Sequence, residues 1–228
     1  RNPDALLWLV RLKQTDQYSY DHSLDVAAHV MIYARHLALP EDVIATLGIA
    51  GMLQDVGKLR MPVRLLQKVG AITRTEYEIF KTHVDFSVQI LAANPNASPL
   101  LLEIVGQHHE RCDGSGYPRG LKGDNIPEVA RIAALADVYD ALTHARAYKH
   151  AWTHEEAVLE IERTSGTHFD PRMVTTFLSL VNHLRRSHGD GFDDYLAEAG
   201  KDSTFIQARD KMHEMLNEME PLQPGELL

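Results

Sequence analysis

The chain has 228 residues, of which 44% are hydrophobic and 24% charged, so it has the composition of a globular protein of one or two domains. Its formal net charge of −9 argues against nucleic acid as a partner, because an acidic surface repels phosphate backbones. Apolar runs are too short for a membrane span, so we expect none. The single cysteine excludes an internal disulfide and suits a reducing cytoplasm, where we expect the protein to reside.

Helical periodicity dominates the sequence, and no segment shows the alternating pattern of a good β-strand. The first predicted helix runs from Ser23 to about Leu37, and a capping box of Thr73 and Glu76 opens the third. In chain order, the predicted helices span residues 23–37, 40–55, 73–93, 99–110, 125–142, 153–163 and 171–186. The pattern therefore predicts an all-α fold.

The last part of the chain has a different pattern. A turn-rich break begins at residue 187, and residues 205–219 have the apolar spacing of an amphipathic helix. We therefore predict a main domain over residues 1–186 and a C-terminal helical appendage over residues 187–228. The apolar face of the appendage favours packing on the domain or on a partner helix over a cofactor site.

Polar side chains interrupt the apolar faces of several predicted helices. A buried carboxylate without a partner is costly, so these groups need one another or a ligand. A lone histidine on an apolar face is more often a hydrogen-bonded core residue than a metal ligand, but here several helices turn a histidine or an aspartate inward. A shared metal centre would satisfy them together, and imidazole with carboxylate suits Fe, Mn, Zn, Co or Ni. The residues are His22, Gln54, Asp55, His83, His108, His109, Asp137 and Asp140.

The segment HHERCDGSGYP, which begins at His108, places two histidines directly before a glycine-rich loop. It resembles the HHExxDGxGYP signature of the HD-GYP domain, a branch of the HD metal-dependent phosphohydrolases. Further segments resemble the family in order over about residues 15–180, among them YDHSLDVA, LQDVGKLRMP, ADVYDALTHARAYK and GTHFDP. The resemblance implies an HD-type helical bundle that hydrolyses the bacterial messenger cyclic di-GMP to pGpG or GMP, and a regulatory domain before residue 1 would be in keeping with it. A protein partner or a homodimer is compatible with the sequence.

The resemblance also implies a binuclear metal centre. His22 and Asp137 would bind one metal, and His83, His108 and His109 the other, while Asp55 would bridge the two. Two transition-metal ions are implied, Fe or Mn in the first place and Zn, Co or Ni as alternatives. Family members with a glutamate four residues before the first histidine hold a third metal, and Tyr18 occupies that place here.

Catalytic and substrate-binding roles follow from the same resemblance. A hydroxide shared by the metals would attack phosphorus, with Asp55 fixing the metals and Lys58 meeting a substrate phosphate. The remaining substrate-binding residues would be Gly114, Gly116, Tyr117 and Pro118 of the loop, together with Arg146, Tyr148 and Lys149. Glu110 would orient a ligand histidine or cap its helix.

The chain departs from the family pattern at Gln54, where the family's HD pair has a histidine. An amide oxygen is a neutral and weaker ligand than imidazole, and it lacks the second ring nitrogen that anchors a ligand histidine. In one interpretation the centre still binds metal and the enzyme works slowly, which the survival of the other motif residues favours. In the other, the domain is catalytically degenerate and binds cyclic di-GMP or a protein without cleaving a bond.

Overall fold

The computed structural model describes residues 3–144 and 151–188. Every named element of secondary structure within these residues is a helix, which confirms the all-α prediction. The α-helices are α1 (Pro3–Thr15), α2 (Gln17–His36), α3 (Glu41–Leu53), α4 (Val63–Leu66), α5 (Arg74–Lys81), α6 (His83–Ala92), α7 (Pro99–Gln107), α8 (Glu128–Thr143), α9 (His154–Arg163) and α10 (Pro171–His188). Two short 3-10 helices, η1 (Val56–Arg60) and η2 (Gly123–Asn125), complete the set.

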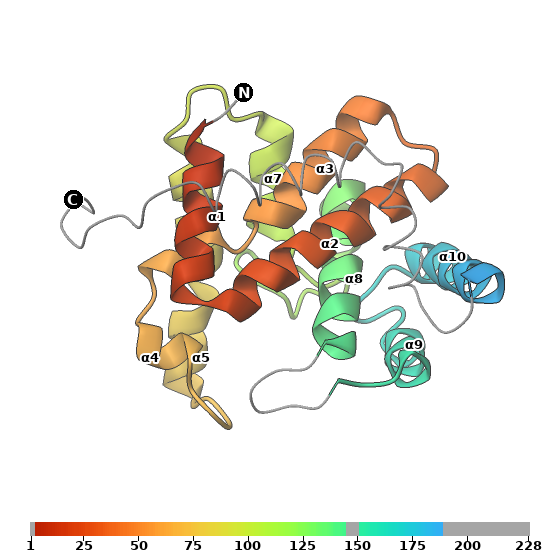
Figure 1. The fold of residues 1–228 in the computed structure, drawn as a ribbon. Coiled ribbons are helices and arrows are strands. Elements are labelled where there is room, and N and C mark those ends of the chain that lie inside the picture. The colour runs from red at the N-terminus through yellow and green to blue at the C-terminus, as the bar shows by residue number, and fades with distance from the viewer. Residues whose placement is uncertain (1–2, 145–150, 189–228) are drawn as a thin grey trace. The chain divides into compact units, whose positions relative to one another are not determined.

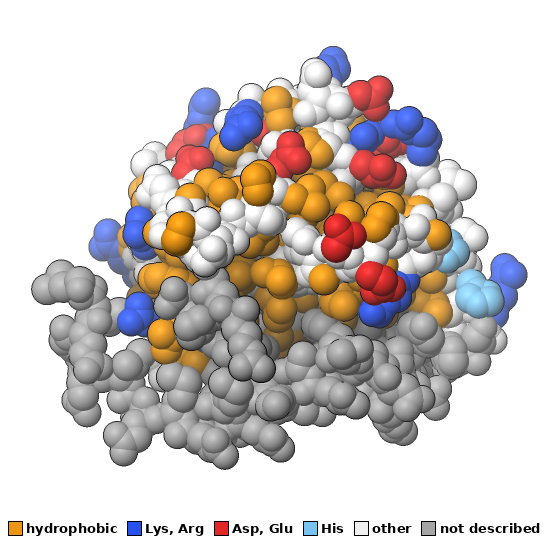
Figure 2. Space-filling view, turned by 90° about the horizontal axis from the view of Figure 1, so that it is seen from above, with side chains coloured by type: hydrophobic (Ala, Val, Ile, Leu, Met, Phe, Trp, Pro, Cys, Tyr) orange, Lys and Arg blue, Asp and Glu red, His pale blue; other side chains and the backbone are white. Residues whose placement is uncertain are grey.

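The chain divides into two compact units, Arg1–Val181 and Asn182–Leu228. Residues 189–228 lie outside the described residues, so the predicted appendage and its helix over residues 205–219 stay predictions. Among the described residues, no helix combines the length and the apolar character needed to cross a bilayer. On the face drawn in Figure 2, basic and acidic side chains are interspersed with apolar ones.

Helix α2 forms the centre of the first unit, where it packs along α3 and across α8 (Figure 1). Its inward face is fully buried through Val26, Ala27 and Val30, as the periodicity of the sequence predicts. Helix α3 approaches closely at Gly51, because a Cβ atom added there would lie 2.7 Å from the Cα atom of Ala27. This packing fixes the end of α3, where Gln54 and Asp55 leave the helix, against the side chains of α2.

The segment predicted as one helix over residues 73–93 forms two helices, and this prediction was wrong. Helix α5 starts with the predicted capping box of Thr73 and Glu76 and has no buried residue, whereas α6 buries His83, Val84 and Ser87. The hydroxyl of Thr82 donates to the carbonyl of Ile79 at 2.6 Å at the junction. The break lets α6 turn its first residue into the core while α5 stays exposed.

Other boundaries differ by smaller amounts. Helix α2 begins at Gln17, six residues before the prediction. Helix α7 ends at Gln107, so His108 and His109, two of the predicted ligands, follow the helix instead of belonging to it. The predicted helix to residue 55 ends at Leu53, and a 3-10 turn carries Lys58. Helices α1 and α4 lie in segments for which no helix is predicted from the sequence.

Candidate metal centre

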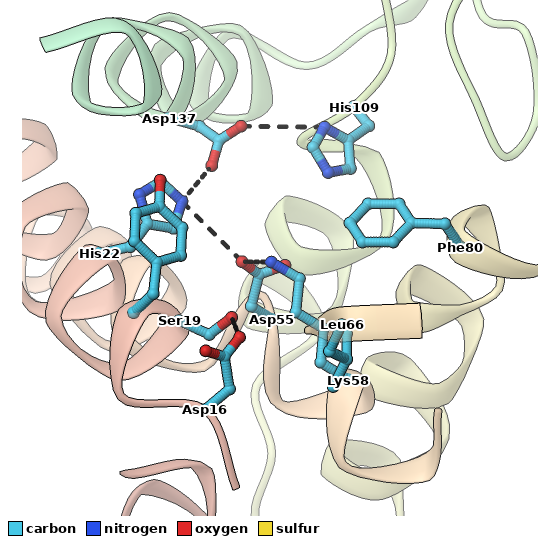
Figure 3. Close-up of a pocket in the computed structure, with 10 residues that line it drawn as sticks. Asp16, Ser19, His22, Asp55, Lys58, Leu66, Phe80, His109 and Asp137 are labelled. Carbon is cyan, nitrogen blue, oxygen red and sulfur yellow. Dashed lines mark hydrogen bonds and ion pairs between the residues drawn. The ribbon is translucent and has the colours of Figure 1, made fainter. Parts of the chain in front are cut away.

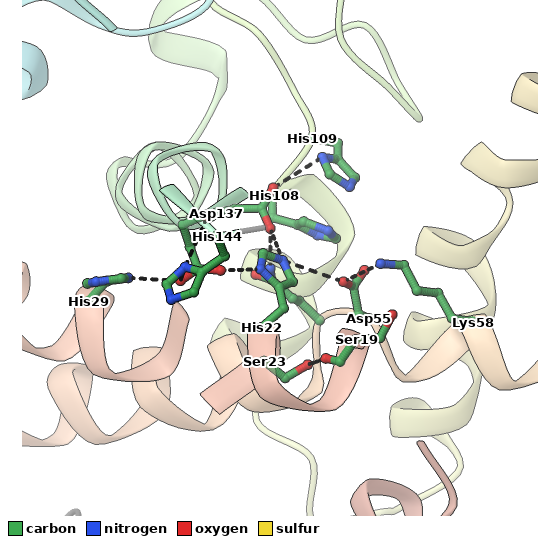
Figure 4. A network of polar contacts seen from close by, with 12 residues as sticks. Ser19, His22, Ser23, His29, Asp55, Lys58, His108, His109, Asp137 and His144 are labelled. Carbon is green, nitrogen blue, oxygen red and sulfur yellow. Dashed lines mark hydrogen bonds and ion pairs between the residues drawn. The ribbon is translucent and has the colours of Figure 1, made fainter. Parts of the chain in front are cut away.

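The structure brings the predicted metal ligands together from separate elements (Figures 3 and 4). In chain order they are His22 on α2, Gln54 and Asp55 after α3, His83 at the start of α6, His108 and His109 after α7, and Asp137 on α8. All are buried except His109, which is partly exposed. In one group of four (Asp55, His83, His108 and His109), each residue offers a ligand atom, and these atoms all lie within 4.8 Å of one another.

Two of these histidines turn their Nε2 atoms toward the centre. The Nδ1 atoms of His83 and His108 each donate to a backbone carbonyl three residues earlier, at 2.7 Å. Their Nε2 atoms are buried without a hydrogen-bond partner, and so is Oδ1 of Asp55, which lies 3.2 Å from Nε2 of His83. Buried polar atoms without partners cost about 1–3 kcal/mol each. A cation would satisfy all three, so these residues fit a metal ion.

The protonation states of His108, His109 and Asp55 also suit metal binding. Burial lowers the pKa of His108, and burial together with the nearby His108 holds the pKa of His109 well below its usual value, so both rings are neutral. Burial alone would raise the pKa of Asp55, but Lys58 and His83 outweigh it and hold that pKa well below its usual range. Neutral imidazole and ionised carboxylate are the forms that bind metals.

The remaining predicted ligands form a hydrogen-bonded group beside the first. Nε2 of His22 donates to Oδ1 of Asp137 at 3.0 Å, and Nε2 of Gln54 donates to the same oxygen at 2.7 Å. His109 Nδ1 lies 3.8 Å from Oδ2 of Asp137, and His22 Nε2 lies 3.9 Å from Oδ2 of Asp55. The two groups therefore adjoin one another, and Asp55 lies between them.

Asp140 anchors His22 from behind, a role that the sequence interpretation missed. Its Oδ2 atom accepts from Nδ1 of His22 at 2.6 Å, and its Oδ1 atom lies 2.9 Å from Nδ1 of His144 and 3.6 Å from Nδ1 of His29. Burial would lower the pKa of His22, but Asp137 and Asp140 outweigh it and raise the pKa to about 10. The role of Asp140 could have been sought from helical spacing. His22 and His29 are seven residues apart and Asp140 and His144 are four apart, so each pair lies on one face of its helix.

A pocket of about 180 Å³ opens beside the centre (Figure 3). It is lined by Asp16, Tyr18, Ser19, His22, Asp55, Lys58, Leu66, Phe80, His109 and Asp137. Nζ of Lys58 lies 2.7 Å from Oδ2 of Asp55, so the ammonium is held beside the candidate ligands. The volume is below the roughly 300–1,000 Å³ of pockets that enclose drug-sized ligands, so it could hold only part of a ligand of that size.

The glycine-rich loop contacts the centre through the ring of Tyr117. The residues of the loop do not line the pocket. The ring of Tyr117 lies 4.7 Å from that of His109, tilted by 34°. Gly116 allows a close approach of the backbone, because a Cβ atom there would lie 2.3 Å from the amide nitrogen of Arg111. Gly114 has φ +83°, which favours glycine. Arg146, Tyr148 and Lys149 lie outside the described residues.

Two other segments hold the loop in place. The buried carboxylate of Glu110 accepts from the amides of Arg119 at 2.7 Å and Leu121 at 2.9 Å, so neither role expected for Glu110, orienting a ligand histidine or capping the helix, accounts for these bonds. The amide of Cys112 donates to the carbonyl of His168 at 3.1 Å. The backbone of the GTHFDP segment thus supports the loop.

Comparison with known proteins agrees with this geometry. A family model described as "HD domain" matches residues 7–173. The cyclic di-GMP phosphodiesterase PA4108 of Pseudomonas aeruginosa is 40% identical over 181 residues, which are 79% of this chain and 44% of that protein. The 3'3'-cGAMP-specific phosphodiesterase 2 of Vibrio cholerae is 39% identical over 164 residues, 68% of this chain and 31% of that protein. The chain thus spans less than half the length of these relatives.

A solved structure supports the fold. Bd1817, an HDG"Y"P protein from Bdellovibrio bacteriovorus, superposes with a TM-score of 0.59 at 19% sequence identity, covering 72% of this chain and 52% of that one. HD domain phosphohydrolases depend on metals, and the chain carries a cluster of side chains that could hold one. The family model, the relatives and the loop that follows the two histidines show that the chain belongs to the HD domain family, in its HD-GYP branch.

Proposed function

We propose that this chain is the catalytic part of a metal-dependent phosphodiesterase that hydrolyses cyclic di-GMP to pGpG, GMP or both. The observation that carries the proposal is the buried cluster of ligand atoms beside a pocket that also holds the ammonium of Lys58. The names of the relatives, which include phosphodiesterases of cyclic di-GMP and of 3'3'-cGAMP, support a cyclic dinucleotide as the substrate class.

The donor atoms support two metal positions that share Asp55. The three histidines His83, His108 and His109 would hold one ion, and His22 with Gln54 and Asp137 would hold the other. Transition metals such as Fe or Mn suit these imidazole and carboxylate donors. Bound ions would supply a water of lowered pKa and polarisation of the phosphate.

The side chains of the protein would bind the phosphate and stabilise its charge. Lys58 would donate to a non-bridging phosphate oxygen and stabilise the charge that builds there in the transition state. Because Asp55 already holds its ammonium at 2.7 Å, Lys58 is in place before the substrate arrives. Leu66 and Phe80 line the same pocket, so apolar side chains flank the ammonium and the carboxylates.

The test is incubation of the metal-loaded protein with cyclic di-GMP and, separately, with 3'3'-cGAMP, followed by chromatography of the products. We expect cyclic di-GMP to be converted to pGpG or GMP, and Lys58→Met to slow the conversion by about 100-fold, since oxyanion-stabilising groups contribute about that much. Faster cleavage of 3'3'-cGAMP would correct the substrate and keep the reaction class.

The second candidate is a module that binds cyclic di-GMP or a partner protein without hydrolysis, and the replacement of the family histidine by Gln54 favours it. The same incubation separates the two. Intact cyclic di-GMP after prolonged incubation, together with measurable binding of the nucleotide, would establish the binding module and overturn the enzyme.

A further inference from the structure

The two metal positions of the proposed centre offer different donor atoms. One position has three imidazoles, from His83, His108 and His109, with a single carboxylate from Asp55. The other has one imidazole, from His22, with carboxylate oxygens and the carboxamide of Gln54. The first set is rich in nitrogen and the second in oxygen.

Gln54 is fully buried, and the direction of its carboxamide is fixed. Its Nε2 atom donates to Oδ1 of Asp137 at 2.7 Å, and the reverse orientation would set the amide oxygen against a carboxylate oxygen. Oε1 of Gln54 is then left buried without a hydrogen-bond partner. A buried amide oxygen in this state is costly unless a donor or a cation satisfies it.

Several other atoms in the described part of the chain are in the same state, some of them outside the candidate centre, such as Oε1 of Gln107. Nε2 of His83, Nε2 of His108 and Oδ1 of Asp55 are also buried without hydrogen-bond partners, and these three belong to the metal cluster. Gln54 directly precedes Asp55 in the chain and is hydrogen-bonded to Asp137, so its carboxamide belongs to the same centre. Its unpartnered oxygen therefore adjoins the candidate centre, where a cation could satisfy it.

We propose that Gln54 is a metal ligand through Oε1. Compared with a histidine at the same place, Gln54 shifts the metal preference of the position that it shares with His22 and Asp137 toward Mn²⁺ and away from Zn²⁺. Oxygen donors suit Mn²⁺, whereas imidazole donors suit Zn²⁺ and Fe²⁺. The chain then loads as a mixed centre, with Zn²⁺ or Fe²⁺ held by the three histidines and Mn²⁺ held beside Gln54. This inference rests on the proposed metal-dependent function.

The experiment counts metals. The full chain is stripped of metal, loaded with one equivalent of Zn²⁺, and titrated with Mn²⁺, with bound and free Mn²⁺ separated by electron paramagnetic resonance and total metals measured by mass spectrometry. We expect one Zn²⁺ and one Mn²⁺ per chain in the wild type. In Gln54→His, the ratio of Mn²⁺ affinity to Zn²⁺ affinity at the second position should be at least tenfold lower than in the wild type.

Gln54→Leu removes the donor atom and tests ligation itself. We expect it to keep the Zn²⁺ equivalent, which shows that the fold and the three-histidine position are intact, and to lose tight binding of Mn²⁺. The inference is overturned if Gln54→Leu binds Mn²⁺ as the wild type does, or if Gln54→His leaves the Mn²⁺ to Zn²⁺ preference unchanged.

Hydrolysis of cyclic di-GMP, measured on the same samples, separates the two proposals. A centre with one Zn²⁺ and one Mn²⁺ but without hydrolysis would overturn the proposed function and support the metal selectivity. Hydrolysis by a wild type whose second position has the same Mn²⁺ to Zn²⁺ preference as Gln54→His would do the reverse.

Discussion

The carboxylate of Asp140 accepts a hydrogen bond from Nδ1 of His22 at 2.6 Å, and the Asp140 side chain is completely buried. This bond fixes the imidazole so that its other nitrogen, Nε2, faces Asp137 and the centre. A carboxylate behind a ligand histidine sets its tautomer and raises its basicity, and the loss of such a partner costs about 10–100-fold in metal affinity or activity.

We therefore predict that Asp140→Asn lowers either Mn²⁺ affinity or turnover by about 10–100-fold. His144→Gln is the control, because it removes a neighbour of Asp140 and leaves the bond between Asp140 and His22 in place. The measurement is turnover as a function of Mn²⁺ concentration for both variants. Equal effects of the two substitutions would show that Asp140 acts through general packing and not through His22.

Gln54→His restores an imidazole ligand in the position that Gln54 now occupies. With Fe²⁺ or Zn²⁺ as the sole metal, we predict that this substitution raises hydrolysis of cyclic di-GMP by about tenfold or more, in line with the usual effect of groups around a metal. Initial rates of product formation check it. An unchanged rate under these metals would contradict the view that Gln54 limits activity.

Gly57 lets η1 press against α6, and the contact sets His83 beside Asp55. A Cβ atom at Gly57 would lie 2.0 Å from the carbonyl oxygen of His83 and 2.5 Å from the amide nitrogen of Ser87. Because both are backbone atoms, Gly57→Ala should lower the free energy of unfolding by about 1–3 kcal/mol or more. Urea denaturation measures the change.

Gly106→Ala serves as the matched control for Gly57→Ala. A Cβ atom at Gly106, within α7, would meet only Cγ2 of Val88, at 3.3 Å, and alanine is the better helix former by about 0.5–1 kcal/mol. We expect this variant to be as stable as the wild type or slightly more so. Similar destabilisation by both substitutions would show that the approach at Gly57 is not special.

His168 gives the stability a dependence on pH. Burial, with a smaller contribution from Arg111, lowers the pKa of His168 to about 4, below the value of about 6.5 for an unfolded chain. The unfolded state therefore binds the proton first as the pH falls, so the stability from neutral His168 is fully present above pH 6.5 and is lost between 6.5 and 4. His168→Gln should show a shallower loss over this range in thermal melts. An identical slope would mean that folding does not lower the pKa of His168.

The sequence predicted the fold class well, because helical spacing is a local signal. The structure also brings the candidate ligands around His108 close to one another, and their role as ligands stays a prediction. It predicted wrongly where structure depends on distant packing. The break at Thr82 interrupts a continuous apolar pattern, and it follows from the contact of α6 with η1. Glu110 finds its partners nine and eleven residues later, in a loop whose path no local pattern gives.

The link between His22 and Asp140 is of the same kind. The two residues are 118 positions apart, and only the packing of α2 on α8 brings them together. The sequence identified both as polar residues on buried faces. It gave no reason to expect a hydrogen bond between them instead of a metal ion bound by both.

Asp55 tests the account most directly, because one carboxylate is assigned to both metal positions and also holds Lys58. The decisive measurement compares the wild type with Asp55→Ala for bound transition metal, by elemental analysis after anaerobic preparation with Mn or Fe, and for hydrolysis of cyclic di-GMP. We predict more than one metal ion per chain and hydrolysis in the wild type, and the loss of both in the variant. A wild type without metal, or a variant with unchanged turnover, would contradict the account.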